Sequence, residues 1–182
     1  LNAYRVEGLD PGYQGVFEKR YTDDFVAMMG GGYADSVATG SGALWLAVAA
    51  LDLPKGSEVI VSPITDPGSL AAITMNGLKP RLADAKTGNY NMGSEQVAAR
   101  LGPNVSAVMA VHASGQATDI DRIVALVHGK GLKVIEDCSQ SHGARVNGRP
   151  IGTFGDVAAI SPMSRKIHIT GGSGGVDYSR DL

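Results

Sequence analysis

The chain contains 182 residues, of which 43% are hydrophobic and 19% are charged, and its formal net charge is −2. A chain of this length suits one domain with a substantial core. The near-neutral charge gives no sign of the basic surface that a nucleic-acid partner requires, and no apolar run approaches the ~18 residues that would cross a membrane. The single cysteine, Cys138, excludes an internal disulfide and fits a reducing compartment, so we expect a cytoplasmic protein.

The hydrophobic pattern predicts helices and strands that alternate along the chain. Residues 16–29 carry apolar side chains with helical spacing, and three successive glycines at 30–32 are expected to end this helix. A continuous apolar run such as residues 58–62 is typical of a strand covered on both faces. The other predicted strands are residues 35–38, 80–83, 106–111, 133–136, 156–161 and 175–178, and the other predicted helices are residues 43–51, a segment between 62 and 80, 94–101 and 119–129.

This alternation predicts βαβ units, and therefore a three-layer α/β/α fold with a mainly parallel central sheet. We expect one domain over residues 1–182. Because the chain starts at Leu1 instead of Met and ends directly after a predicted strand, we also expect it to be a piece of a longer protein. Ligands bind such sheets at the carboxyl ends of the strands, so the residues that follow strands are the candidates for function.

The first candidate segment is Thr39–Leu44, which lies between a predicted strand and a predicted helix. Gly40 and Gly42 let the backbone approach an anion, and Ser41 adds a hydroxyl at a helix N-terminus, where negative charge is favoured. The segment has neither the dinucleotide glycine pattern nor a Walker lysine, so a single phosphate is the better ligand. The alternative is a plain tight turn in which Ser41 caps the helix.

The second candidate segment ends a buried strand with two carboxylates, Glu136 and Asp137. A buried carboxylate without a partner costs several kcal/mol. A bound cation, such as a protonated pyridine ring, would explain an Asp137 carboxylate at this buried position. The alternative is an aspartate that caps a helix or forms a salt bridge. We expect His142 to be structural and Cys138 to be unreactive.

The third candidate segment is the loop Ser161–Gly175, which contains Arg165 and Lys166 side by side. A lysine becomes a nucleophile for Schiff-base chemistry when burial or a neighbouring cation favours its neutral form, and Arg165 is such a neighbour. The alternative is a surface loop with solvated charges. No metal is expected in this site.

Taken in order, these segments resemble the DegT-type nucleotide-sugar aminotransferases, a branch of the fold-type I enzymes that use pyridoxal 5'-phosphate (PLP). The resemblance extends from about Gly15 to Asp181. The segments that carry it are Thr39–Leu44, Val59–Pro63, Val111–Gln116, Glu136–Ala144, Gly155–Ser161 and the lysine loop that ends at Gly174-Gly175.

The resemblance implies a role for each matching residue. Lys166 would hold PLP covalently and move a proton, Asp137 would pair with the pyridine nitrogen, and Gln140 would lie beside the phenolic oxygen. Gly40, Ser41 and Ser161 would bind the phosphate. The implied reaction moves an amino group from glutamate or glutamine to a keto-sugar attached to a nucleotide. The chain would be the PLP-binding large domain of a homodimer, without the smaller carboxy-terminal domain.

The sequence departs from the commonest family pattern in two places. The lysine loop is one residue longer, and we assign Lys166 instead of Ile167 because the run Lys-x-His-x-Thr-Gly-Gly-x-Gly-Gly fits a longer form of the loop. Asp66 stands where many members place an aromatic residue over the cofactor ring. Two alternatives therefore stay open: a sugar dehydratase, which uses histidine in place of the lysine and for which His168 is the candidate, and a truncated relative without activity.

Overall fold

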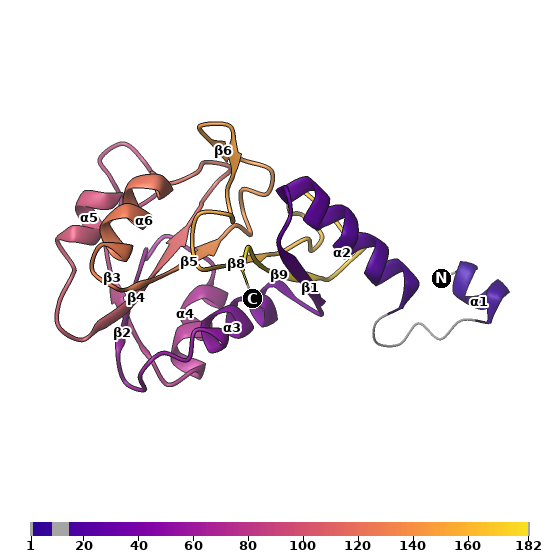
Figure 1. Cartoon of the computed structure of the whole chain (residues 1–182), viewed down its shortest axis with the longest axis horizontal. Helices are drawn as coiled ribbons and strands as arrows, with labels where there is room; N and C mark the ends of the chain where they lie inside the picture. The colour runs from indigo at the N-terminus through magenta and orange to yellow at the C-terminus, as the bar shows by residue number, and fades with distance from the viewer. Residues whose placement is uncertain (1, 9–14, 182) are drawn as a thin grey trace.

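The computed structural model describes residues 2–8 and 15–181, so residues 1, 9–14 and 182 of the predicted domain lie outside the described part. Its centre is a seven-stranded sheet with the order β1-β9-β8-β5-β4-β2-β3 (Figure 1). Only β9 runs against its neighbours, and the pairs formed by β2, β3, β4, β5 and β8 are parallel. The strands are β1 Tyr33–Val37, β2 Glu58–Val61, β3 Lys79–Leu82, β4 Val105–Val111, β5 Lys133–Asp137, β8 Val157–Ile160 and β9 Gly175–Ser179.

Helices cover both faces of this sheet. The helices α3 and α4 pack on one face, while α5, α6 and α2 pack on the other (Figure 1). The bounds are α1 Asn2–Glu7, α2 Val16–Met29, α3 Gly40–Ala50, α4 Pro67–Met75, α5 Ser94–Ala98 and α6 Ile120–His128. The predicted three-layer fold with a mainly parallel sheet is therefore confirmed.

Several predicted boundaries were wrong by a few residues. The helix expected from residue 43 begins at Gly40, and the strand expected over 35–38 is Tyr33–Val37. The helix expected to reach residue 101 ends at Ala98. Helix α1 and the hairpin of β6 (Arg145–Val146) and β7 (Arg149–Pro150) were not predicted, because segments this short show no hydrophobic period.

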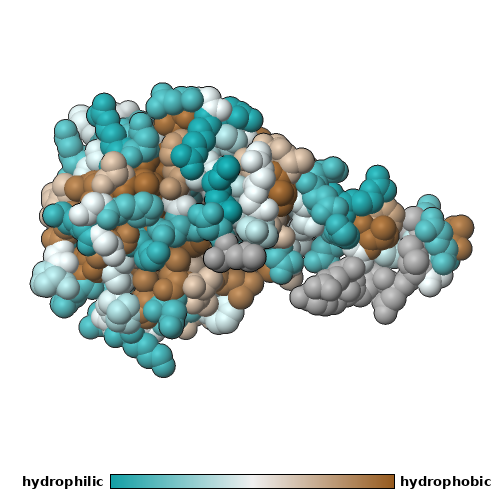
Figure 2. Space-filling model, in the orientation of Figure 1, coloured by the Kyte–Doolittle hydropathy of each residue, from teal (hydrophilic) through white to brown (hydrophobic). Residues whose placement is uncertain are grey.

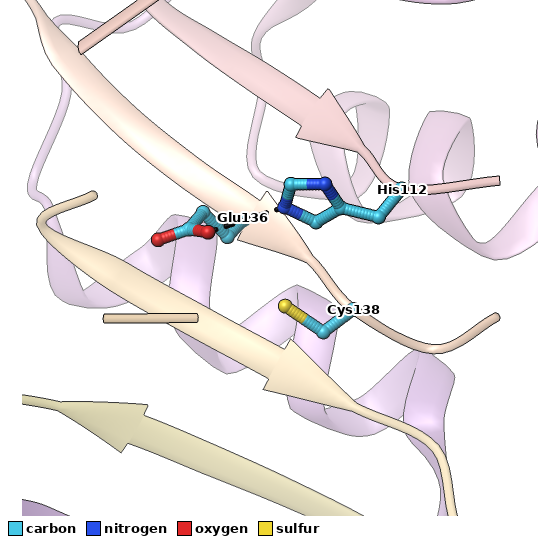
Figure 3. Close-up of side chains that lie close together, drawn as sticks. All are labelled: His112, Glu136 and Cys138. Carbon is cyan, nitrogen blue, oxygen red and sulfur yellow. Dashed lines mark hydrogen bonds and ion pairs between the residues drawn. The ribbon is translucent and has the colours of Figure 1, made fainter. Parts of the chain in front are cut away.

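The side chain of Glu136 on β5 is fully buried (Figure 3). Successive side chains of a strand point to opposite faces, so Glu136 lies on the face opposite to that of Asp137. His112 Nε2 lies 3.1 Å from Oε2 of Glu136. Three backbone N–H groups within residues 152–155 also donate to the carboxylate, at 2.6–2.7 Å. The N–H of Thr118 donates to His112 Nδ1, so the ring proton is on Nε2 and is donated to Glu136. Glu136 thus joins β4, β5 and the segment that leads into β8.

Cys138 is the third side chain of this buried cluster (Figure 3). Its sulfur and the ligand atoms of His112 and Glu136 lie within 4.8 Å of one another, which is close enough to suggest a metal site. Both ring nitrogens of His112 and both oxygens of Glu136 already have hydrogen-bond partners. Burial, and then the nearby carboxylates, raise the pKa of Cys138 well above its usual range, so it remains a thiol. We interpret the cluster as a structural network.

Glu136→Gln tests this network. Burial raises the pKa of Glu136, but the hydrogen bonds from His112, Gly155 and Gly152 outweigh burial and leave the pKa below its ordinary value. An amide cannot accept from all four donors, so we expect the free energy of unfolding to fall by about 3 kcal/mol near neutral pH. The difference between the two proteins should shrink as acid protonates the wild-type carboxylate, because a lowered pKa stabilises the fold only while the group is ionised.

Denaturant titration measures this effect, and Glu58→Gln is the matched control. Glu58 forms a half-exposed ion pair with Arg81 at 2.8 Å, so its replacement should cost under about 1 kcal/mol. Equal losses in the two variants would show that the Glu136 network contributes no more than a surface pair.

Asp177 on β9 faces Asp35 on β1, and neither of its carboxylate oxygens has a hydrogen-bond partner among the described residues. Burial, followed by repulsion from Asp35, raises the pKa of Asp177 to about 7. Because the folded pKa lies above the ordinary value of 3.8, the fold loses stability as the pH rises between these two values.

Asp177→Asn should therefore stabilise the protein by about 1–3 kcal/mol at about pH 8 and by nearly nothing at about pH 4. Denaturant unfolding at the two pH values measures the difference. A gain of the same size at both would contradict the ionisation of Asp177 as its cause. Asp35→Asn, which removes only the repulsion, should give a smaller gain at the higher pH.

Candidate functional site

A cavity of about 310 Å³ opens among the segments that follow β1, β2, β5 and β8. Its size is at the lower end of the range of about 300–1,000 Å³ that is usual for small-ligand sites. The carboxyl ends of these parallel strands share one edge of the sheet, which is where ligands bind in such folds. Five of the six residues predicted for the site line the cavity: Gly40, Ser41, Asp137, Ser161 and Lys166.

The first turn of α3 forms one wall of the cavity. Thr39 caps this helix, since its Oγ1 atom accepts the N–H of Gly42 at 3.0 Å. The alternative in which Ser41 is the cap was therefore wrong, and the Ser41 hydroxyl is left to face the cavity. A Cβ atom on Gly40 would lie 2.3 Å from Cβ of Ser161, so only glycine lets the helix approach that strand end. The turn offers backbone N–H groups and hydroxyls to an anion.

Asp137 ends β5 with its side chain in the cavity wall, and it is only 4% exposed. Ser69 Oγ donates to its Oδ2 atom at 2.7 Å, and the N–H of Ser139 donates to Oδ1 at 3.1 Å. The hydroxyls of Ser69 and Thr65 lie 2.6 Å apart and extend this chain of hydrogen bonds. Asp137 neither caps a helix nor forms an ion pair within the described part of the chain, which leaves its charge available to a ligand.

Lys166 reaches the cavity from the loop after β8, and its Nζ atom lies 2.8 Å from Oδ2 of Asp66. The Lys166 side chain is 18% exposed and that of Asp66 is 61% exposed. The hydrogen bond from Lys166 outweighs partial burial and lowers the pKa of Asp66. Arg165 was expected to be the charged neighbour of the amine, but it is exposed and has a φ of 72°. The charged neighbour of the Lys166 amine is therefore the Asp66 carboxylate and not the Arg165 guanidinium.

Gln140 is the predicted site residue that does not line the cavity. Its Nε2 atom lies 3.4 Å from Oδ2 of Asp66, and its Oε1 atom accepts the N–H of Ser114 at 3.1 Å. Gln140 therefore contacts the cavity indirectly, through Asp66. Sequence patterns singled out Asp66 only as a missing aromatic residue, and they gave no sign of Ser69, because both contacts depend on the direction of side chains at the start of α4.

His168 lies on the same loop as Lys166 but points away from the cavity. Its ring stacks on Tyr21 of α2, with centroids 5.8 Å apart, and on His142, with centroids 4.9 Å apart. His142 in turn stacks on Phe25 at 5.9 Å. Burial, and then the nearby His168, lower the pKa of His142, which favours its neutral form. The stack fastens the lysine loop to α2, and it confirms that His142 has structural contacts.

The arrangement brings three chemical functions to one cavity. A primary amine at Lys166, a carboxylate at Asp137 and an anion-binding turn at Gly40 and Ser41 all line it. An amine can bond covalently to a carbonyl, a buried carboxylate can pair with a cation, and a helix N-terminus can bind a phosphate. These groups suit a ligand that carries an aldehyde, a basic ring nitrogen and a phosphate.

Known proteins with similar sequences and structures share this architecture. GDP-perosamine synthase of Vibrio cholerae is 36% identical over 97% of this chain and 48% of its own length. The aminotransferase from Psychrobacter cryohalolentis superposes with a TM-score of 0.94 at 33% identity, over 99% of this chain and 46% of its own. The E coli GDP-4-keto-6-deoxy-D-mannose-3-dehydratase with bound hydrated PLP superposes with a TM-score of 0.90 at 25% identity, over 99% of this chain and 47% of its own.

The chain thus spans about half the length of each of these relatives. None of the helices in its described part is long and apolar enough to cross a membrane. The model of the DegT/DnrJ/EryC1/StrS aminotransferase family matches residues 7–181. The cavity, the fold and these similarities agree, and the chain belongs to the DegT/DnrJ/EryC1/StrS aminotransferase family.

Proposed function

We propose that this chain is the cofactor-binding large domain of a PLP-dependent aminotransferase that moves an amino group from glutamate or glutamine to a nucleotide-linked keto-sugar. The observation that carries the proposal is the meeting of Lys166 and Asp137 in one cavity with the first turn of α3. These residues are far apart in the sequence, and they would have no reason to converge if the lysine loop were only a solvated surface loop.

Each predicted site residue that lines the cavity then has a task. The first turn of α3, with Ser41 and Ser161, would bind the phosphate of the cofactor, while Asp137 would hold its ring nitrogen in the protonated form. PLP supplies an aldehyde and an electron-accepting ring when it is bound. Lys166 would hold the cofactor through Nζ, and the same atom would carry a proton to and from the substrate carbon. Ser69 and Ser139 would keep the Asp137 carboxylate in one orientation.

The dehydratase alternative receives less support from the arrangement of the loop. A dehydratase of this type would need His168 in the position of the reactive amine. Here Lys166 lines the cavity, while His168 stacks between Tyr21 and His142. An aminotransferase needs a lysine at the cavity, and Lys166 lines it, so we prefer this function.

We also propose that the complete protein acts as a homodimer with a further, smaller domain. The chain accounts for about half the length of its relatives, which leaves room for such a domain. Apolar residues are visible over α3 and α4 in the lower part of Figure 2, and the exposed apolar side chains of these helices include Trp45, Leu46 and Met75. An apolar helical surface of this kind favours contact with another protein surface.

Lys166→Ala should abolish covalent binding of the cofactor. The wild-type protein, incubated with PLP, should turn yellow, and borohydride should then fix the cofactor to the peptide that contains Lys166. Peptide mass spectrometry measures the adduct. Lys133→Ala removes a lysine that pairs with Asp156 outside the cavity and serves as the matched control. A wild-type adduct on another lysine would contradict the assignment, and a protein that never colours would support the alternative of an inactive relative.

Asp137→Asn should keep the covalent cofactor but lose most of the reaction with glutamate. A neutral amide no longer stabilises positive charge on the ring nitrogen, so we expect the rate to fall on the order of 100-fold or more. The spectral change on addition of glutamate measures the rate without the sugar substrate. Asp119→Asn is the control, since Asp119 accepts hydrogen bonds from Ser94 and does not line the cavity. Unchanged turnover in Asp137→Asn would refute the role of this carboxylate.

A further inference from the structure

Asp66 occupies the N-cap position of α4 but does not use its side chain as a cap. An aspartate at this position ordinarily accepts a backbone N–H of the helix that it precedes. Here the carboxylate turns to the cavity instead, where its Oδ2 atom meets Lys166 Nζ at 2.8 Å. The Asp66 side chain thus contacts a residue 100 positions away and makes no capping hydrogen bond to the backbone of α4.

Lys166 has no other anionic partner in the part of the chain that the structure describes. Its loop is held by few backbone hydrogen bonds, such as Ser164 N–H to the carbonyl of Gly172 and Thr170 N–H to that of Pro162. These bonds, and the stacking of His168 on Tyr21 and His142, hold the backbone of the loop, but none of them fixes the direction of the Lys166 side chain. The contact with Asp66 is what directs the amine into the cavity.

Gln140 holds the carboxylate of Asp66 from a second direction. Its Nε2 atom lies 3.4 Å from the oxygen that Lys166 contacts, and its Oε1 atom is held by the N–H of Ser114. The three side chains Asp66, Gln140 and Lys166 come from the segments after β2, β5 and β8. Such a polar bridge between separate segments constrains its members more than an isolated surface pair would.

The same turn of α4 also fixes the second residue of the proposed catalytic pair. Asp66 contacts Lys166, and Ser69, three positions later, donates to Asp137 at 2.7 Å. Residues three apart on a helix lie on the same side, so one turn can serve both partners. The start of α4 therefore sets the relative placement of the amine and the acid.

We propose that Asp66 is a positioning residue for Lys166. The Asp66 carboxylate holds the ammonium group of Lys166 at the cavity whenever no cofactor is bound to that lysine. This inference rests on the proposed function for its purpose, but the ion pair can be measured without the cofactor. The hydrogen bond from Lys166 is the largest cause that lowers the pKa of Asp66. A lowered pKa means that the carboxylate stays ionised, and the ion pair intact, to a lower pH than an ordinary aspartate would allow.

Limited acetylation of the complete, cofactor-free protein with acetic anhydride tests the contact. An amine held in an ion pair reacts more slowly than a free one, so Asp66→Asn should raise acetylation of Lys166 about two- to fivefold relative to the other lysines. Peptide mass spectrometry measures the ratio. About 1 M salt should raise the acetylation of wild-type Lys166 and leave the variant nearly unchanged, because salt screens the pair.

Asp23→Asn is the matched control. Asp23 pairs with Lys19 at 2.7 Å on the exposed face of α2, so its replacement should raise the acetylation of Lys19 and leave Lys166 unaffected. Asp66→Glu, which keeps the charge, should restore most of the protection of Lys166. If Asp66→Asn leaves Lys166 acetylation at the wild-type level while Asp23→Asn raises that of Lys19, the proposal is overturned.

The rate at which the complete protein takes up PLP provides a second test. Attack on the PLP aldehyde, like acetylation, needs the Lys166 amine released from the carboxylate, so Asp66→Asn should take up PLP faster, as followed by absorbance, and reach the same final stoichiometry. Unchanged or slower uptake would show that Asp66 does not hold the amine before the cofactor binds. A wild-type protein that forms no adduct on Lys166 would refute the proposed function instead, and the acetylation result would still report on the ion pair.

Discussion

The arrangement of the candidate site depends on one buried carboxylate, that of Glu136. Four donors satisfy it, one from His112 and three from the backbone of residues 152–155, so its charge is tolerated without contact with water. Successive side chains of a strand point to opposite faces, and Asp137 therefore faces the cavity because Glu136 faces the core. The residue that holds the strands together thus fixes the direction of the residue that meets the ligand.

The cavity has walls from distant parts of the chain because parallel strands end at a common edge. The turn after β1, the start of α4, the end of β5 and the lysine loop each contribute one kind of group. The first turn of α4 has the widest reach, because it contacts Asp137 through Ser69 and Lys166 through Asp66. A short element that makes no covalent contact with a ligand can in this way determine where both reacting groups lie.

The sequence alone predicted the layers of the fold and five of the residues that line the cavity. Buried strands show as continuous apolar runs, and the candidate residues Gly40, Ser41, Asp137, Ser161 and Lys166 each follow a strand, so the position of their backbone could be inferred. Side-chain directions could not be. Asp66 turns to Lys166 and His168 turns to Tyr21, and each choice is set by partners from elsewhere in the chain. Nothing in the residues of β9 indicated that this strand would run antiparallel to its neighbours.

The stack of Tyr21, His168 and His142 joins the first long helix to a loop near the other end of the sequence. Contacts between residues so distant must overcome the loss of chain entropy on closing a large loop, and such contacts tend to form late. During synthesis, α2 leaves the ribosome before His168 has been added to the chain, so Tyr21 cannot yet stack on that ring. The contacts that hold the amine-bearing loop against α2 therefore cannot form until Tyr21, His142 and His168 have all been synthesised.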